Sequence, residues 1–423
     1  AAAWADKKAK GIVYLGPGVS GGLNDTTVDE AKLGKHGLPV LRTAEDLAKA
    51  SGITVGQLRF LAFARKVSKV SHYRTFKLKK KTGGERVISA PMPRLKNLQR
   101  WILESVLDKV ALHPAAHGFR HERSILSNAQ PHVGSPIVVN LDLKDFFPSI
   151  RYPRVKGLFR WLGYSEQVAT ILALVTTAPD VEEVVLDGTR WFVATTQRRL
   201  PQGAPTSPAI TNVLCDRLDR RLTTAAAVLG FTYTRYADDL TFSAKPDLQV
   251  DVGKLLRRTK WLVEKDGLEV HPKKTRVLRK ASRQEVTGLV VNAKAAVPRE
   301  ALRRFRAVLQ QIDKHGPKGK KWGESDDVLA SIDGFANYVF MINPAKGAAL
   351  KSKVAALWKK YGYARAKYAR KAKPPQPPKP PVASPAPSPS SSSPPPTSSP
   401  PPSSTPPPSP PEDKPKKPWW KLW

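Results

Sequence analysis

The chain has 423 residues, with 71 Lys and Arg against 35 Asp and Glu and a formal net charge of +36. This excess indicates a polyanionic partner, because each phosphate that a cation neutralises releases condensed counterions and strengthens binding. Cys215 is the only cysteine, which excludes an intrachain disulfide and a cysteine zinc site and suits the cytoplasm. The sequence has no apolar run of about 18 residues and no signal-peptide core, so we expect neither membrane insertion nor secretion.

The N-terminal part of the chain is predicted to be a leader followed by two short helices. Residues 1–40 contain a glycine-rich piece without the Gly-Lys-Ser/Thr ending of a phosphate loop, and we expect this leader to be flexible. Thr43 can cap a first helix, with Asp46 three positions on, and Gly52 separates this helix from a second one. A DNA-reading helix-turn-helix is one interpretation. A helical pair that braces the neighbouring domain or touches RNA is the favoured one.

A basic hairpin and a core helix are predicted next. Two strand-like runs in residues 76–91 are joined by a turn at 82–84, and three lysines and Arg86 project positive charge from them. Apolar residues recur at helical spacing over 95–106 and predict a helix that faces the core. Residues 117–124 mix cationic side chains with a phenylalanine, a composition typical of a nucleic-acid contact. The histidines of this region lack tight ligand spacing and are interpreted as loop residues rather than metal ligands.

Three carboxylates are candidates for a catalytic centre. An apolar run at 137–139 predicts a buried strand, and Asp142 falls near its end, where an acid without a partner is out of place. Residues 234–243 predict two short strands around a tight turn that carries the adjacent Asp238 and Asp239. Adjacent acids repel each other and favour a divalent cation with oxygen ligands, such as Mg²⁺. Carboxylates that meet at two ions ~3.5–4 Å apart would support phosphoryl transfer, whereas a surface Asp-Asp turn is the alternative.

The remaining elements are predicted from periodicity and composition. Residues 152–200 favour a helix followed by a strand pair that turns at an Asp-Gly dipeptide. Residues 212–222 favour a helix behind the carboxylates, in which Asp216 and Asp219 form ordinary ion pairs with neighbouring arginines. Pro298 begins a helix with an apolar inner face and an arginine-rich outer face. The last 53 residues hold 22 of the chain's 40 prolines, amid serines, and we expect a disordered tail there.

Four motifs, in this order along the chain, resemble those of the reverse transcriptases: LDLKDFFPSI at Leu141–Ile150, PQGAPTSP at Pro201–Pro208, YADD at Tyr236–Asp239 and GLEVHPKKT at Gly267–Thr275. Two short matches are similar to signatures of the bacterial retron type, namely the Asn-Ala-x-x-His spacing from Asn128 to His132 and the run Val286-Thr287-Gly288. The alternatives are a group II intron-like or other bacterial reverse transcriptase and, from another class, a non-catalytic RNA-binding scaffold.

The resemblance implies an α+β fold of the right-hand polymerase type, with fingers, palm and thumb and an antiparallel palm sheet. The expected boundaries are a flexible leader over 1–40, N-terminal helices and fingers over 41–136, a palm over 137–151 and 200–292 with a fingers/palm insertion over 152–199, a thumb over 293–372, and a disordered Pro/Ser-rich tail over 373–423.

The resemblance also implies roles for individual residues. Asp142, Asp238 and Asp239 would be the catalytic ligands of two Mg²⁺ ions, joined by the backbone carbonyl of Leu143. Lys274, or alternatively Lys273, would donate a proton to the pyrophosphate leaving group. Phe147 would be the steric gate that rejects a ribose 2′-hydroxyl, so that the product is DNA. The implied nucleotide contacts are Phe147, Gln202, Gly203 and Arg86, and the implied RNA contacts are Asn128, His132, Val286, Thr287, Gly288 and Arg303.

The activity implied by the resemblance is RNA-directed DNA polymerisation. A retron enzyme starts from the 2′-hydroxyl of a guanosine in its own structured non-coding RNA and makes branched multicopy single-stranded DNA, which serves in antiphage defence. The implied partners are this RNA, deoxynucleoside triphosphates, the RNA–DNA product and an effector protein. The sequence shows no second acidic cluster for a ribonuclease H, so template removal is expected from a host enzyme.

Overall fold

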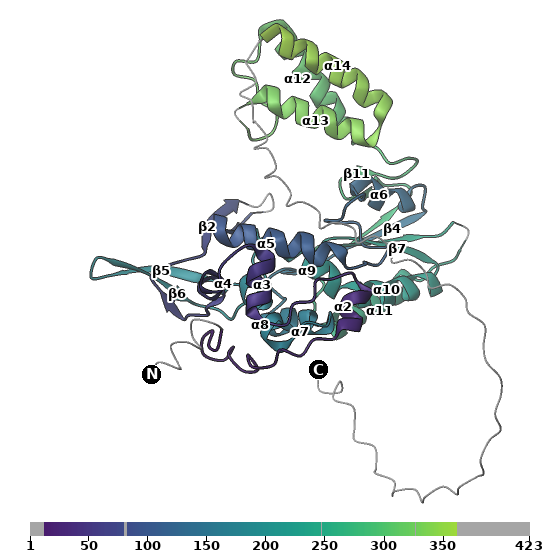
Figure 1. The fold of residues 1–423 in the computed structure, drawn as a ribbon. Helices are drawn as coiled ribbons and strands as arrows, with labels where there is room; N and C mark the ends of the chain where they lie inside the picture. The colour runs from purple at the N-terminus through teal and green to yellow at the C-terminus, as the bar shows by residue number, and fades with distance from the viewer. Residues whose placement is uncertain (1–11, 80–82, 247, 326, 362–423) are drawn as a thin grey trace, which may run out of the picture. The chain divides into compact units, whose positions relative to one another are not determined.

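The computed structural model describes residues 12–79, 83–246, 248–325 and 327–361, so the tail expected over 373–423 lies outside the described residues. A four-stranded sheet carries the candidate carboxylates (Figure 1). Its strands lie in the order β7, β8, β4, β9, and all neighbours are antiparallel. The strands are β4 (Ile137–Asp142), β7 (Phe231–Tyr236), β8 (Asp239–Ala244) and β9 (Arg276–Arg279). The predicted buried strand and the strand pair around the Asp turn are thus confirmed.

Two helices cover one face of this sheet, α10 (Asp216–Val228) and α11 (Val252–Lys265). Apolar residues of both helices and of the strands form one buried cluster, because alternate strand residues point to the helical side. Members of this cluster are Leu218 and Leu222 of α10, Leu255 and Leu262 of α11, Leu141 of β4, Phe231 of β7, and Leu240 and Phe242 of β8. This packing fixes the register of the strands that end at the carboxylates.

The N-terminal segment corrects one expectation. Residues 12–40 were expected to form a flexible leader, yet Ile12, Leu15 and Leu33 are buried in the largest apolar cluster of the described residues. The segment includes α2 (Glu30–Lys35) and precedes α3 (Ala44–Ser51) and α4 (Val55–Ala62). The glycine-rich composition suggested flexibility, but the isolated apolar residues of this segment pack in the core. The two predicted helices are confirmed, including the capping box of Thr43 with Asp46.

A second group of helices packs in that same cluster. It consists of α5 (Pro93–Ser105), η1 (Leu107–Lys109), α7 (Tyr152–Trp161), α8 (Glu166–Thr176) and α9 (Ser207–Leu214). In α5, Leu95, Leu98 and Ile102 are buried, which confirms the predicted core-facing helix. Helix α8 is buried from Gln167 to Thr176 and contacts α3, α4, α5 and α7. The region between 152 and 176 therefore holds two helices where the sequence indicated one.

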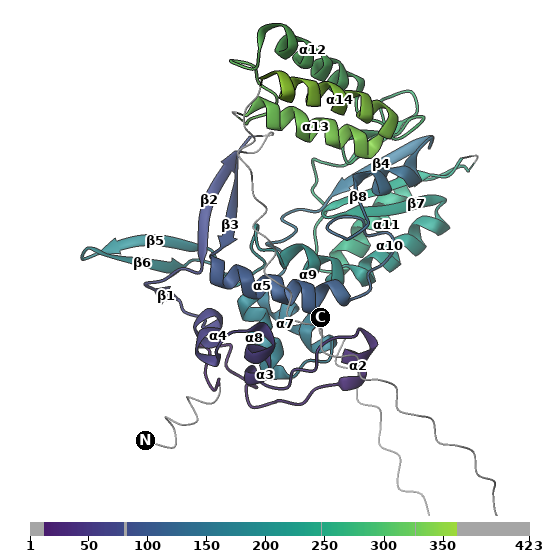
Figure 2. The ribbon, with the colours of Figure 1, turned by 45° about the horizontal axis from the view of Figure 1, so that its top comes forward.

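Two hairpins extend from these helices, as Figure 2 shows. The basic hairpin consists of β2 (Tyr73–Lys79) and β3 (Glu85–Pro91), although its turn residues 80–82 lie outside the described part. The second hairpin consists of β5 (Val181–Leu186) and β6 (Thr189–Ala194), joined at Asp187 and Gly188 in left-handed conformations, and β6 also pairs with β1 (Val67–Ser68). Both hairpins are confirmed predictions.

Three helices form a bundle at the C-terminal side of the described chain: α12 (Arg299–His315), α13 (Val328–Ile342) and α14 (Pro344–Tyr361) (Figure 2). Helix α12 buries Leu302, Phe305, Leu309 and Ile312, which confirms its predicted apolar face. Across the described residues, no helix has both the length and the hydrophobicity needed to cross a membrane.

Candidate active site

The sheet register brings three acidic residues together. Asp142, the last residue of β4, pairs directly with Asp239, the first residue of β8. Opposite residues in an antiparallel pair have Cα atoms about 5 Å apart. The backbone N–H of Leu143 donates to the carbonyl of Asp238 at 2.9 Å, which holds the third carboxylate at the same edge. Residues almost a hundred positions apart in the sequence therefore form one acidic cluster.

The crowding of these acids changes their ionisation. Desolvation and the charge of Asp142 raise the pKa of Asp238, against the opposing influence of Lys274 and Arg86. Desolvation and the charges of Asp238 and Asp142 raise the pKa of Asp239 to about 6. Burial first, and the neighbouring carboxylates second, thus disfavour the charged forms of Asp238 and Asp239. An additional cation would stabilise these charged forms.

The Lys274 ammonium provides part of the positive charge beside the cluster. Its Nζ lies 2.9 Å and 3.0 Å from the two carboxylate oxygens of Asp142. In the described part of the chain, no set of three or more His, Cys, Asp or Glu side chains is arranged for a metal ion. The charge and type of the three side chains fit a divalent cation, since carboxylate oxygens are its preferred ligands. Two backbone hydrogen bonds lie on either side of Leu143: the N–H of Lys144 donates to the Glu269 carbonyl, and the N–H of His271 donates to the Asp142 carbonyl. The Leu143 carbonyl takes part in neither bond.

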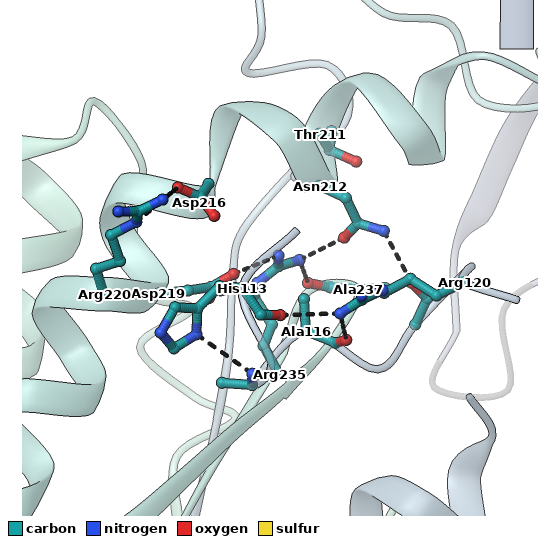
Figure 3. Close-up of polar contacts among 12 residues, drawn as sticks. His113, Ala116, Arg120, Thr211, Asn212, Asp216, Asp219, Arg220, Arg235 and Ala237 are labelled. Atoms are coloured by element: carbon teal, nitrogen blue, oxygen red, sulfur yellow. Dashed lines mark hydrogen bonds and ion pairs between the residues drawn. The ribbon is translucent and has the colours of Figure 1, made fainter. Parts of the chain in front are cut away.

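A buried ion pair supports the turn that carries Asp238 (Figure 3). The Arg235 guanidinium donates to both carboxylate oxygens of Asp219, at 2.9 Å and 2.7 Å, and both side chains are fully buried. Arg235 also donates to the Asn212 side-chain oxygen at 3.0 Å and to the Ala237 carbonyl at 3.1 Å. Ala237 has φ +57°, a left-handed conformation that is uncommon for a residue with a side chain. Arg235 thus holds the turn in this conformation.

This network corrects the interpretation of Asp219. Asp216 does pair with Arg220, four residues on in the same helix, as expected. Asp219 instead faces the sheet, where its partners are Arg235 and the hydroxyl of Tyr233, which donates at 2.8 Å. Arg235 was not among the predicted site residues. The only signal was a charged residue near the end of a predicted strand, and a charge that is buried there requires a partner.

The loop at residues 117–119 is packed against the same turn. The N–H of His117 donates to the Arg235 carbonyl at 2.8 Å, and the Asn212 amide donates to the Gly118 carbonyl at 2.8 Å. A Cβ atom at Gly118 would lie 2.6 Å from the backbone nitrogen of Ala237, so only glycine fits there. Figure 3 shows this region, in which Arg120 also donates to the carbonyls of His113 and Ala116.

Aromatic rings follow directly from this loop. Phe119 has φ +56°, and its side chain is 54% exposed. The centre of its ring lies 6.5 Å from that of Phe147 and 6.3 Å from that of Tyr236. Phe147 is half-buried and also contacts Phe146, which is buried in the core. Of the two adjacent phenylalanines, Phe147 is the one that reaches the surface beside the acidic cluster.

The predicted nucleotide-binding residues of PQGAPTSP lie against the basic hairpin. The N–H of Ser89 in β3 donates to the Gln202 carbonyl at 2.7 Å. Gly203 has φ +120°, and a Cβ atom there would come within 3.0 Å of the Ile88 side chain. Arg86 is exposed on the same strand and lies near enough to Asp238 to lower its pKa. The hairpin, the Gln202 segment and the acidic cluster therefore form one region.

The predicted RNA contacts divide into buried and exposed residues. Asn128, His132 and Val286 are buried, so their side chains do not lie at the surface of the described structure, and a direct RNA contact by them stays a prediction. They lie on α6 (Ile125–Ala129), η2 (Gln130–His132) and β10 (Glu285–Val286), which pairs with β11 (Leu289–Val290). These elements pack where the sheet meets the C-terminal bundle.

His132 is a buried link between strands rather than a loop residue. Its Nδ1 lies 2.7 Å from the Ser243 hydroxyl and its Nε2 lies 2.7 Å from the Thr234 hydroxyl. Burial lowers the pKa of His132 to about 3, so the imidazole is neutral. Thr287 and Gly288, both with positive φ, form the two-residue turn between β10 and β11. Gly288 and Arg303 are exposed.

The comparisons with known proteins agree on one family. The family described as Reverse transcriptase (RNA-dependent DNA polymerase) matches residues 78–291. The Retron Mx162 reverse transcriptase of Myxococcus xanthus is 45% identical over 370 residues, which cover 83% of this chain and 75% of that protein. The Retron Ec86 reverse transcriptase of Escherichia coli is 32% identical over 337 residues, covering 78% and 94%.

Among solved structures, apo telomerase from Candida tropicalis matches with a TM-score of 0.41 and 12% identity over 70% of this chain and 59% of that chain, a likeness too low to carry an argument. The sequence identity to the retron enzymes is much higher, and the matches span most of both chains. The chain therefore belongs to the reverse transcriptases, the RNA-directed DNA polymerases, and within them to the retron reverse transcriptases.

Proposed function

We propose that the acidic cluster is the polymerisation centre, in which Asp142, Asp238 and Asp239 hold two Mg²⁺ ions together with the Leu143 carbonyl. The observation that carries this proposal is the register that pairs Asp142 with Asp239. When bound, two such ions activate the primer hydroxyl and stabilise the charge of the leaving pyrophosphate. Reverse transcriptases use divalent metal ions generally, and a bound cation would offset the burial and mutual repulsion that raise the pKa of Asp239.

Other residues around the cluster have proposed roles in handling the nucleotide. Lys274, beside Asp142, is suited to give a proton to the leaving pyrophosphate. Arg86 on the basic hairpin is suited to bind the triphosphate, and Gly203 lets that hairpin approach closely. Phe147, half-buried beside Phe119, is the proposed gate that clashes with a ribose 2′-hydroxyl.

The described elements suit the parts of a right-hand polymerase. We propose that the four-stranded antiparallel sheet with α10 and α11 is the palm, over 137–151 and 200–292. The fingers would comprise the N-terminal helices and basic hairpin over 41–136 with the insertion over 152–199. The bundle of α12, α13 and α14, within 293–372, would be the thumb, and the exposed Arg303 of α12 would contact RNA.

The substrate proposed for this centre is a structured non-coding RNA. The similarity to retron enzymes supports priming from this RNA and synthesis of branched multicopy single-stranded DNA for antiphage defence. The net charge of +36 supports a polyanionic partner. An effector protein and a host ribonuclease H would complete the system in the cytoplasm, with deoxynucleoside triphosphates as the other substrate.

Primer extension on an RNA template tests the polymerisation centre. Asp142→Asn and Asp238→Asn should each lower the rate more than about 10³-fold, equivalent to ~4 kcal/mol of transition-state stabilisation. Asp216→Asn is the matched control, since it removes a carboxylate that pairs with the exposed Arg220. EDTA should stop extension and Mg²⁺ restore it. Extension that survives both carboxylate variants would exclude the proposed centre.

The nature of the product needs a separate experiment. Nucleic acid copurified with the full chain should contain RNA joined covalently to DNA, and an enzyme that cleaves 2′,5′ branches should separate the two. Sequencing the released strands would identify the RNA and the priming nucleotide. Copurified DNA with no RNA attached would contradict the branched product, while leaving the polymerase assignment intact.

A further inference from the structure

Helices α10 and α11 lie side by side against the sheet (Figures 1 and 2), and their outer positions form a basic surface. Their apolar residues face the sheet, which leaves polar side chains outward at spacings of three and four residues. We call this surface the α10–α11 face. Its residues are Arg217, Arg220, Arg221, Thr224 and Val228 on α10 and Lys254, Arg257, Arg258, Trp261 and Lys265 on α11.

The carboxylates near this face are fewer than its cations, and one of them, Asp266, lies near enough to Arg217 and Arg221 for their charges to act on its pKa. Arg220 pairs with Asp216 at 2.8 Å, and Lys260 at the edge of the face pairs with Glu264 at 3.8 Å. Within the described ranges, no ion pair with a carboxylate engages the other cations of the face, which are Arg217, Arg221, Lys254, Arg257, Arg258 and Lys265. A concentration of like charge of this kind produces a local potential that attracts an anionic partner.

The Trp261 ring contacts two of these cations, Arg221 and Arg258. Its side chain is 42% exposed, with the Arg258 guanidinium carbon 4.7 Å and the Arg221 guanidinium carbon 5.6 Å from the ring centre. A guanidinium held over an aromatic ring keeps its charge and its planar fork of donors, which matches a phosphate. The groove between the helices is lined by Arg220, Arg221, Thr224, Lys254 and Arg258, with Val228 80% exposed at one end.

We propose that the α10–α11 face binds the phosphate backbone of base-paired RNA. This inference rests on the proposed function, because it gives the structured RNA a second contact surface on the outer side of helices whose inner side packs on the sheet. A-form RNA presents phosphates and 2′-hydroxyls across a wide, shallow groove, which suits a surface two helices wide. Recognition here would follow duplex shape and would not depend on base sequence.

Binding of a fluorescent RNA hairpin of arbitrary sequence, with a stem of about 16 base pairs, tests the assignment. Arg221→Glu/Arg258→Glu is compared with Lys35→Glu/Lys49→Glu, which changes the charge equally at exposed positions of α2 and α3. The first variant should bind about tenfold more weakly at 0.15 M salt, and its slope of log affinity against log salt should be smaller by about 2. Equal affinity and slope for the two variants would overturn the proposal.

Photocrosslinking in an otherwise unchanged chain gives an independent readout. A benzoylphenylalanine at Thr224, in the groove, should crosslink to the hairpin, whereas the same group at Lys49 should not. Excess unlabelled hairpin should abolish the crosslink and polyglutamate should not. Equal competition by polyglutamate, or equal crosslinking at the two positions, would overturn the assignment to RNA and favour an acidic protein partner.

Activity on a generic template separates this inference from the proposed function. The variant Arg221→Glu/Arg258→Glu should extend oligo(dT) on poly(rA) at the wild-type rate, because neither residue belongs to the acidic cluster. If the proposed polymerisation centre is wrong, the Asp142→Asn and Asp238→Asn variants will still extend the primer, and this result does not depend on how the hairpin binds.

Discussion

Arg235 and Asp219 form a bidentate ion pair in which neither side chain is exposed. Because the pair is fully buried, removing one partner leaves a charge without compensation. We expect Arg235→Met to lower the free energy of unfolding by about 3–5 kcal/mol, measured by urea denaturation. Replacing both partners, as in Asp219→Leu/Arg235→Met, should restore only part of this loss: no charge then remains buried, but the Tyr233 hydroxyl and the Asn212 oxygen lose their hydrogen bonds.

The double variant also separates stability from activity. It still lacks the hydrogen bond from Arg235 to the Ala237 carbonyl, so the Asp238 turn is no longer held. A misplacement of about 1 Å can slow a reaction about 100-fold, and we expect a loss of this order in the rate of nucleotide incorporation. Wild-type incorporation by a stable double variant would show that Arg235 acts only on stability.

Protonation of His132 should destabilise the protein at acidic pH. The folded-state pKa of about 3 lies below the unfolded value of about 6.5, so the unfolded chain binds the proton more tightly. Stability is therefore complete above pH 6.5 and is lost as the pH falls towards 3. At pH 5.5 the loss is about 1.4 kcal/mol for this residue, and buried His117, with a pKa lowered to about 4, adds in the same direction.

Urea denaturation at pH 7.5 and 5.5 measures this effect. His132→Gln should be less stable than the wild type at pH 7.5, because one of the two hydroxyl partners, Ser243 or Thr234, loses its hydrogen bond. Its further loss on acidification should be smaller than that of the wild type. An identical loss in the two proteins would contradict the assignment of this proton to His132.

Lys274 should affect both magnesium use and the maximal rate. Its ammonium is bonded to both oxygens of Asp142, so a metal ion has to compete with it. Lys274→Met should lower the Mg²⁺ concentration needed for half-maximal incorporation and, through loss of a proton donor, reduce the maximal rate at least ~100-fold. Single-turnover incorporation across a Mg²⁺ titration measures both. Lys273→Met is the control. If this variant showed the same two changes, in Mg²⁺ requirement and in maximal rate, the effects would not be specific to Lys274.

Gly203 should be required for nucleotide binding because of its closeness to the basic hairpin. Gly203→Ala would place a Cβ atom 3.0 Å from Ile88 and 3.1 Å from the Ser89 carbonyl, displacing β3, and we expect a higher KM for deoxynucleotides. Gly134→Ala is the matched control, since Gly134 also has positive φ but open space around its Cβ position. A comparable rise in KM in both variants would indicate backbone strain rather than contact with the hairpin.

Phe147 should determine the choice of sugar. Its ring reaches the surface beside Phe119 and Tyr236, whereas Phe146 is buried. Phe147→Ala should raise ribonucleotide incorporation relative to deoxynucleotide incorporation by at least tenfold, about 1.4 kcal/mol. The ratio of kcat/KM for the two nucleotides on one template measures this. An unchanged ratio would show that another residue excludes the hydroxyl.

The elements that define the sheet could be predicted because their signals are local. The apolar run before Asp142, the strand pair around Asp238 and the capping box at Thr43 each depend on residues close in sequence. The pairing of Asp142 with Asp239 is not local. It was inferred from the chemistry of the acids and from resemblance, and the strand register of the structure agrees with it.

The missed features all depend on distant partners. Asp219 was assigned to arginines of its own helix, because nothing in the sequence shows that this position faces Arg235 of β7. The burial of Asn128 and His132 likewise depends on how α6 and η2 pack on the sheet, which no local pattern shows. The packing of Ile12 in the core could also not be predicted, because the segment around it is rich in glycine and has no apolar periodicity.

The contact between Gly118 and Ala237 has a mechanical consequence. With no room even for a methyl group between the two backbones, the loop before Phe119 and the bend before Asp238 cannot shift independently. If a template strand passes the exposed Phe119 ring, a displacement of this loop would be transmitted to the turn that carries Asp238, which we propose to bind metal. Strand movement and alignment of the reacting groups would then be one motion, transmitted by main-chain atoms.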